Sequence, residues 1–174
     1  MAYPEAPWRL HGELILVPTW PPGRGVMLAR YTGGTLAYHE LIAFSHTTPR
    51  GAVISHIYVD DERSLHGGIE IWGLPKQLAT FTYERDRFTA RQGDVTLLHA
   101  WIRRRRGRLP LTLPTPFTSH RGVTIGRARI KGALALVKLE VPHNSPIAHL
   151  RLNGTHLALA GDELDLTIPP PHAT

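Results

Sequence analysis

Short apolar runs recur along the whole chain, and proline, glycine and polar turn residues separate them. Runs of this length and spacing are typical of strands in a β-rich sheet or barrel. We therefore predict a mostly β chain (β-rich α+β) that forms a curved or closed antiparallel β-barrel-like sheet. The expected strands cover residues 14–17, 26–31, 36–44, 52–59, 80–85, 87–91, 95–102, 123–130, 133–141, 148–152 and 156–159.

Helical patterning is sparse, and the best candidate covers residues 61–72. Acidic residues at its start would cap a first helical turn, whereas Gly67 and Gly68 disfavour a long helix. We therefore expect a short helix or an irregular segment there. Residues 109–116 carry three prolines and are expected to be extended or looped, because proline cannot donate to a central ladder. The proline-rich end at residues 169–172 is expected to fray.

The composition limits the chemistry that the chain can perform. Its 174 residues, 42% of them hydrophobic, suit one domain with a real core, taken here as residues 1–174. There is no cysteine, so disulfides, zinc–thiolate sites and cysteine nucleophiles are excluded. We find no targeting segment and no apolar stretch long enough to span a membrane, so we expect a soluble cytoplasmic protein with no membrane partner.

Arginine carries most of the net charge of +6, because only three of the 20 basic residues are lysines. The densest basic stretch, residues 103–108, fits a solvated strand end, an anion-binding patch or a contact between subunits. Nucleic-acid binding is disfavoured, because the aromatic residues that would interleave with basic ones on a binding face make up 7% of the chain. The 11 histidines show no metal-ligand spacing, so we predict no metal site.

Two charged residues stand in apolar surroundings. Glu40 lies in the alternating run 36–44, on its aromatic and aliphatic face, where a carboxylate is costly unless it is paired or used. The residues alone leave open whether it has a structural or a functional role. Lys76 follows the sequence Trp-Gly-Leu-Pro, so it either occupies an apolar pocket or extends its ammonium group to water. Lys131 and Lys138 belong to alternating strands and are expected on solvent faces.

The segment from Gly68 to Lys76 reads Gly-Ile-Glu-Ile-Trp-Gly-Leu-Pro-Lys and resembles the G-x-E-x-x-x-x-P-K segment of the acetoacetate decarboxylase family. In that family a strand ending in an aliphatic–Asp pair precedes the segment, and residues 57–62 match it. The Tyr-His-Glu at residues 38–40 is similar to the family's Tyr-x-Glu, and the later strands come in the family's order. The resemblance covers most of the chain and implies the same β-rich fold and a homo-oligomer.

The resemblance implies a reaction that needs neither metal nor organic cofactor. In the family, the lysine after the proline, here Lys76, forms a Schiff base with a β-keto acid, and the protonated imine accepts electrons as carbon dioxide leaves. Glu40 takes the position of the family's active-site glutamate, which positions substrate or shuttles a proton. Imine formation needs a neutral amine, whereas an ordinary lysine has a pKa of about 10.4, so apolar surroundings are required. We therefore predict a carboxy-lyase that acts on a small keto acid such as acetoacetate.

The predicted substrate contacts are Tyr38, Trp72 and Leu74, together with Arg30. Arg30 ends a strand just before a turn, where its guanidinium group is a candidate for binding the substrate carboxylate. Gln77 stands where typical members of the family carry a second lysine. Two alternatives stay open: an aldolase-dehydratase that uses the same lysine, and a non-catalytic β-barrel that binds a small molecule.

Overall fold

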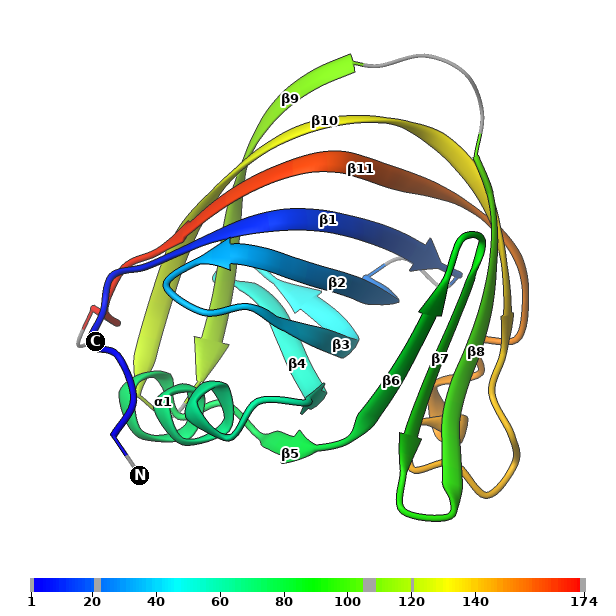
Figure 1. Cartoon of the computed structure of the whole chain (residues 1–174), viewed down its shortest axis with the longest axis horizontal. Coiled ribbons are helices and arrows are strands. Elements are labelled where there is room, and N and C mark those ends of the chain that lie inside the picture. Colours follow the sequence, from blue (N-terminus) through cyan, green and yellow to red (C-terminus); the bar gives the residue numbers. More distant parts are fainter. Residues whose placement is uncertain (1, 21–22, 105–108, 120, 173–174) are drawn as a thin grey trace.

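In the computed structural model, strands of a curved sheet make up most of the chain, and one end of the sheet is covered by a helix (Figure 1). The structure describes residues 2–20, 23–104, 109–119 and 121–172. Its elements are β1 (Trp8–Thr19), β2 (Arg24–Gly34), β3 (Tyr38–Thr48), β4 (Gly51–Val59), α1 (Glu62–Trp72), β5 (Lys76–Leu78), β6 (Thr80–Glu84), β7 (Arg87–Gln92), β8 (Val95–Arg104), β9 (Leu109–Ser119), β10 (Gly122–Glu140), the 3-10 helix η1 (Ala148–Leu150) and β11 (Gly154–Ile168).

The sheet curls until it nearly closes on itself. Strands β1 to β4 are antiparallel neighbours in chain order, β1 also pairs with β11, and β11 pairs with β10. Strand β9 joins β10 to β4, where Ala52 pairs with Phe117 and Val53 with Thr118. The predicted barrel-like sheet is therefore confirmed, although this short seam closes it loosely. The sheet is also not purely antiparallel, because β4 runs parallel to both β9 and β5.

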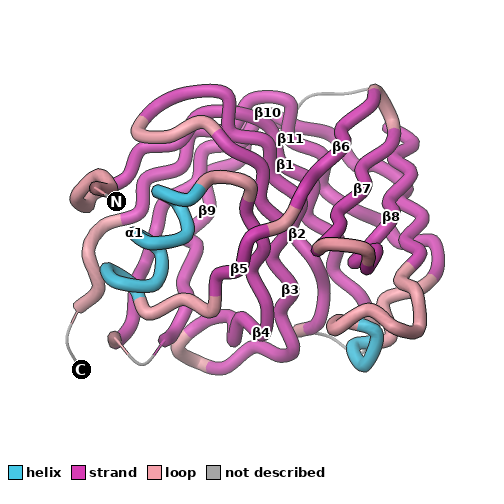
Figure 2. Tube along the Cα trace, turned by 60° about the horizontal axis from the view of Figure 1, so that its bottom comes forward, coloured by secondary structure: helices cyan, strands magenta, loops and turns pink. Residues whose placement is uncertain are grey.

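Alternating side chains of the long strands fill two separate hydrophobic clusters. Figures 1 and 2 show β6–β8 at one end of the molecule and α1 at the other. The hairpin-side core, next to β6–β8, includes Ile15, Val17, Val26, Leu28, Leu41, Phe88, Leu97, Leu98, Val137 and Leu139. The helix-side core, next to α1, consists of Trp8, Leu10, Leu14, Ala29, Tyr31, Leu36, Tyr38, Ile57, Val59, Trp72, Ala128, Ile130, Leu164 and Leu166.

Strand β3 shows how the alternation in the sequence divides residues between these cores. Tyr38 belongs to the helix-side core, and Glu40 lies on the same face of the strand. Leu41 and Ala43 belong to the hairpin-side core. The face predicted from the alternation is therefore the face that the strand turns toward α1.

The predicted short helix is α1, whose ends follow from local sequence. The Asp61 side chain caps its start by accepting the backbone N–H of Ser64 at 2.9 Å. Gly73 ends it with φ of 66°, a left-handed conformation that favours glycine. Gly67 and Gly68, expected to disfavour a long helix, lie buried inside it. No helix in the described part of the chain is both long and apolar enough to cross a bilayer.

The two proline-rich segments compare differently with their predictions, since residues 109–116 are extended as one of the two expected forms and residues 169–172 are held in place. Residues 109–116 belong to strand β9, which pairs with β10 along its length and with β4 only at its end, so its prolines lie in a strand with a largely open edge. The chain end is also held in place, because the Pro169 carbonyl accepts the Trp72 indole N–H at 2.8 Å and His172 bridges to Val123. The expected fraying is therefore wrong for residues 169–172.

Replacing Asp61 by alanine is expected to lower the free energy of unfolding by about 1 kcal/mol, because the N–H of Ser64 loses its acceptor. Urea unfolding followed by circular dichroism measures this loss. Asp61→Asn keeps an acceptor and is expected to recover most of the stability, since the exposed Asp61–Arg63 pair contributes little. Equal losses in the two variants would contradict the capping role.

Candidate active site

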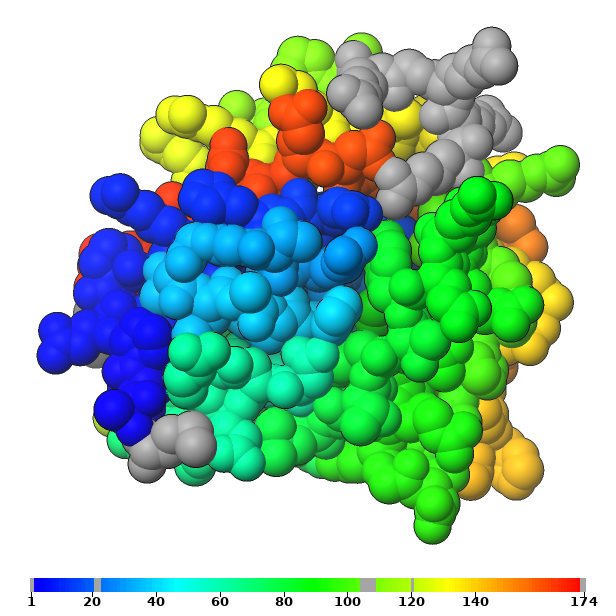
Figure 3. Space-filling model, in the orientation of Figure 1, coloured from blue at the N-terminus to red at the C-terminus, as the bar shows by residue number. Residues whose placement is uncertain are grey.

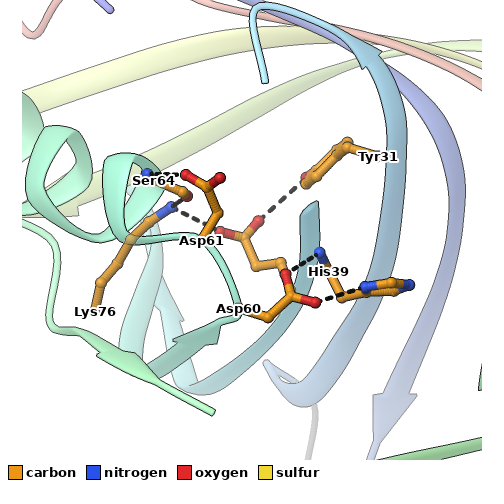
Figure 4. Close-up of polar contacts among 7 residues, drawn as sticks. Tyr31, His39, Asp60, Asp61, Ser64 and Lys76 are labelled. Atoms are coloured by element: carbon orange, nitrogen blue, oxygen red, sulfur yellow. Dashed lines mark hydrogen bonds and ion pairs between the residues drawn. The ribbon is translucent and has the colours of Figure 1, made fainter. Parts of the chain in front are cut away.

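Lys76 is directed into the molecule by the turn that follows α1. After the left-handed Gly73, the chain passes through Pro75 and forms β5, which pairs with β4 and places Lys76 opposite Ile57. The lysine side chain is only 3% exposed. Its Nζ donates to Glu40 Oε1 at 2.9 Å and to Ser64 Oγ at 2.9 Å (Figure 4). A cation buried this deeply is tolerated because it is both paired and hydrogen-bonded.

Glu40 is the partner of this amine and is held from two sides. Its side chain projects from β3 and is 6% exposed. Oε1 accepts the Lys76 amine, and Oε2 accepts the hydroxyl of Tyr31 from β2 at 3.1 Å (Figure 4). Ser64, from the first turn of α1, completes the group of four polar side chains. Two strands, one helix and the short strand β5 thus bring their polar groups to one buried point.

Two aromatic rings also lie near the lysine amine. Nζ lies 5.2 Å from the centre of the Tyr38 ring and 5.7 Å from that of Trp8. Trp8 in turn packs edge-on against Trp72, with ring centres 4.8 Å apart. Ring faces attract cations, so these contacts help to offset the cost of removing the amine from water.

The two helix glycines explain how α1 can approach the site so closely. A Cβ on Gly67 would lie 2.5 Å from the Trp8 ring, and one on Gly68 would lie 2.4 Å from Cδ of Lys76. Only residues without a side chain fit at these two positions. Gly68 is the glycine of the family-like segment, whereas Glu70 of the same segment points outward and accepts the hydroxyl of Tyr3.

A cavity of about 490 Å³ opens from the Lys76–Glu40 pair and lies inside the curled sheet, with strand β9 forming part of its wall. Among the described residues that line it, Lys76 and Glu40 carry the only charges. The apolar lining includes Leu16, Met27, Ile42, Phe44, Ile54, Leu74, Phe117, Ile130, Leu164 and Ile168. Such a cavity is typical of a small-molecule site, with a few polar groups that fix orientation.

The tyrosines at the site remain protonated donors. Burial raises the pKa of Tyr31 well above its ordinary value, and the nearby Glu40 charge raises it further. The pKa of Tyr38 is raised well above its usual range by the same two causes, burial first, while Ser64 acts in the opposite direction. A phenol that keeps its proton can donate to a carboxylate or to a carbonyl oxygen.

A second polar pair fixes the strand that carries Glu40. Asp60, at the end of β4, accepts both the backbone N–H of His39 at 2.7 Å and its ring Nδ1 at 2.8 Å (Figure 4). Burial raises the pKa of Asp60, but these bonds from His39 outweigh it and hold that pKa below its usual range. Because His39 precedes Glu40, the pair links β3 to the start of α1.

The structure brings together five of the six predicted site residues. Tyr38, Trp72 and Leu74 line the cavity with Lys76 and Glu40.

Arg30 lies outside this group. Its exposed side chain reaches Glu13, with Nη1 3.8 Å from Oε1, and its guanidinium group lies over the Tyr83 ring at 5.6 Å. Figure 3 shows β6–β8 (green) packed directly against β2 and β3 (blue to cyan) on this face. Arg30 faces away because its neighbours Ala29 and Tyr31 turn toward the helix-side core.

Three residues at the site have no counterpart in the sequence prediction: Trp8, Tyr31 and Ser64. Tyr31 could have been found by extending the alternation of β2 opposite β3, since it pairs with Tyr38. Ser64 carries no such signal, because its position depends on how α1 packs.

The other polar candidates lie elsewhere or outside the description. Gln77 is exposed and accepts the side-chain amide of Gln92 at 2.9 Å, so it adds nothing to the site. Within the described ranges, no three His, Asp or Glu side chains cluster as metal ligands would. Lys131 and Lys138 are exposed, as predicted, and the structure pairs each of them with a glutamate. The arginine run continues through residues 105–108, which lie outside the described residues.

Comparisons with known proteins agree on one family. The family model for acetoacetate decarboxylase (ADC) matches residues 14–120. The fold is similar to an acetoacetate decarboxylase of Legionella pneumophila, with a TM-score of 0.67 and 18% identity over 100% of this chain and 89% of that one. A second acetoacetate decarboxylase structure gives a TM-score of 0.59 and 15% identity over 97% and 88%. An acetoacetate decarboxylase-like enzyme from Sphingomonas wittichii RW1 gives 0.57 and 12% over 96% and 92%. A search of curated proteins finds no match.

Gly68→Ala is expected to destabilise the protein, although alanine favours a helix over glycine by about 1 kcal/mol. The new Cβ would lie 2.4 Å from Cδ and 2.5 Å from Cε of Lys76, whose amine is fixed by two hydrogen bonds. Urea unfolding of Gly68→Ala, Lys76→Ala, the double variant and the parent measures the coupling. With Lys76→Ala as background, Gly68→Ala is expected to be neutral or stabilising. The same loss in both backgrounds would show that the lysine is not what requires glycine.

The free energy of unfolding is expected to fall as pH rises above about 10, the pKa of an exposed tyrosine. Tyr31 and Tyr38 have raised pKa values in the folded state, so the unfolded chain releases their protons first. Their contribution is therefore complete below that pH and is lost above it. Tyr31→Phe should make the fall shallower by about 1 kcal/mol per pH unit. Denaturant titrations at several alkaline pH values test this, and an unchanged slope would argue against a buried Tyr31 phenol.

Proposed function

The chain belongs to the acetoacetate decarboxylase family, and from this premise we propose that it decarboxylates a β-keto acid through an imine on Lys76. One observation carries the proposal: the Lys76 side chain is 3% exposed, and its amine lies at the inner end of an apolar cavity, 2.9 Å from a carboxylate. A lysine with only a structural role at this depth would not require an open cavity beside its amine.

Glu40 supplies the means to make the amine nucleophilic. Transfer of one proton from Nζ to Oε1, across 2.9 Å, converts the ion pair into a neutral amine and a neutral acid. Tyr31 and Ser64 keep their hydrogen bonds to the pair and hold it in place during the transfer.

The neutral amine then attacks the keto carbon, and loss of water leaves a protonated imine on Lys76. The bond between the carboxylate carbon and the adjacent carbon breaks, its electron pair moves toward the iminium nitrogen, and carbon dioxide leaves an enamine. Protonation of the enamine carbon and hydrolysis of the imine release the ketone and restore the lysine. The net reaction consumes one proton, and Glu40 is the acid and base nearest to the reacting nitrogen.

The surroundings of the carboxylate also favour this reaction. Apart from Lys76, the described residues that line the cavity provide no cation. A substrate carboxylate there is poorly solvated, whereas the charge is spread out as carbon dioxide departs. The cavity therefore stabilises the transition state relative to the bound acid, which is the condition for catalysis.

The same imine would also support addition to a second carbonyl compound, as in an aldolase-dehydratase. Product analysis separates the two reactions, because decarboxylation releases carbon dioxide and a ketone, whereas condensation gives one larger unsaturated acid.

Incubation with a panel of keto acids, followed by borohydride reduction and peptide mass mapping, is expected to give a covalent adduct on Lys76. Reduction fixes the imine, so the mass of the peptide reports both the site and the acid. Glu40→Gln keeps the shape of the side chain but cannot take the proton, and it is expected to slow adduct formation about a hundredfold.

Lys131→Ala provides the matched control, because it removes a lysine that is 58% exposed and distant from the cavity lining. It should give the adduct at the parent rate, and Lys76→Ala should give none. Circular dichroism checks that each variant is folded. An adduct on another lysine, or none with any acid in the panel, would overturn the proposed function.

A further inference from the structure

We infer that the substrate of this site carries an extended apolar chain, and that it is an unbranched 3-oxo acid of medium length rather than acetoacetate. The inference rests on the proposed imine chemistry for the reacting end of the molecule. For the apolar chain of the substrate, the inference rests on the size, direction and lining of the cavity.

The cavity is much larger than acetoacetate requires. Its volume of about 490 Å³ is within the range of sites that bury most of a drug-sized ligand, about 300–1,000 Å³. A small keto acid bound at Lys76 would leave most of this apolar space to be filled by water. Apolar cavities hold water poorly, because water there lacks hydrogen-bond partners.

The cavity also has a direction, from a closed end to an open one. Its lining residues on β3 run from the buried Tyr38 and Glu40, through the half-buried Phe44, to the exposed Thr47 and Thr48. Thr47 lies seven positions beyond Glu40 along the strand, which corresponds to roughly 20 Å. Lys76 is thus at the bottom of a long passage rather than beside its mouth.

The next strands in the sheet, β4 and β9, show the same change from buried to exposed lining residues. Along β4, Ile57 next to Lys76 is buried, whereas Ile54 and Ala52 are half-buried. On β9, Leu113 and Pro114 line the same cavity and are exposed. The mouth therefore lies between the β3–β4 turn and β9, at the loosely closed seam of the sheet.

The chemistry of the lining matches a molecule with one polar end. Glu40, Lys76, Tyr31 and Tyr38 are all at the closed end, and between them and the mouth the walls are mainly aliphatic or aromatic. A 3-oxo acid has its keto group and carboxylate within a few atoms of each other. With these at the closed end, its alkyl chain follows the apolar walls toward Thr47 and Thr48.

A homologous series tests the inference with two independent readouts. Straight 3-oxo acids of about four to about fourteen carbons are trapped with borohydride, and the matching methyl ketones are titrated against the fluorescence of Trp8 and Trp72 beside the site. The dissociation constant of the ketones is expected to fall about fourfold with each added methylene until the chain reaches the mouth, because each one leaves water. Trapping on Lys76 should follow the same order.

The two readouts separate the inference from the proposed function. Adducts on Lys76 that form equally well at every chain length, or only with the shortest acid, would overturn the inference and leave the imine chemistry in place. Binding that strengthens with chain length, without any adduct, would support the apolar chain and overturn the proposed function.

Two neighbouring substitutions on β4 sharpen the test. Ala52→Phe places a ring in the outer half of the cavity and is expected to remove most of the gain from long chains, so that the ratio of long-chain to short-chain affinity falls at least tenfold. Val53 is the next residue and is absent from the lining, so Val53→Phe is the matched control and should keep the parent ratio. An unchanged ratio in Ala52→Phe would place the chain elsewhere and contradict the inference.

Discussion

The buried ion pair between Lys76 and Glu40 is the interaction that constrains the rest of the structure. Two charges removed from water need nearly complete compensation, and removal of one partner from such a pair typically costs about 3–5 kcal/mol. Here compensation comes from Ser64 and Tyr31, each of which makes one further hydrogen bond to the pair. The two groups proposed to react therefore also help to make this packing of β2, β3, α1 and β5 the preferred one.

The two halves of the chain contribute differently to the site. The polar groups all come from residues 31–76, inside the range that the family model matches. The apolar wall opposite them comes in large part from β10 and β11, which lie beyond residue 120, the end of that match. Strands β10 and β11 thus line the cavity without contributing to its polar group. A change on β10 or β11 can reshape the cavity without moving the amine or the carboxylate.

The sequence predicted those residues of the site that local patterns indicate. Alternation along β3 put Glu40 and Tyr38 on one face, and the proline–lysine segment singled out Lys76. Both could be recognised because each signal is contained in a short stretch of sequence. Ser64 and Trp8 were not predictable, because their contacts depend on how closely α1 approaches the sheet, which Gly67 and Gly68 determine. Arg30 was assigned from its place before a turn, but the direction of its side chain is set by its neighbours in β2.

The charge balance of the cavity connects the fold to the reaction proposed for it. Lys76 and Glu40 cancel each other, so the apolar cavity has no net charge before substrate enters. An entering keto acid adds one unbalanced negative charge, and the reaction removes that charge as carbon dioxide departs. The surface carries the net +6 of the chain and attracts anions from solution, whereas the interior offers the carboxylate little stabilisation. The substrate carboxylate is thus first attracted by the positive surface and then destabilised in the apolar cavity. This destabilisation favours its loss as carbon dioxide.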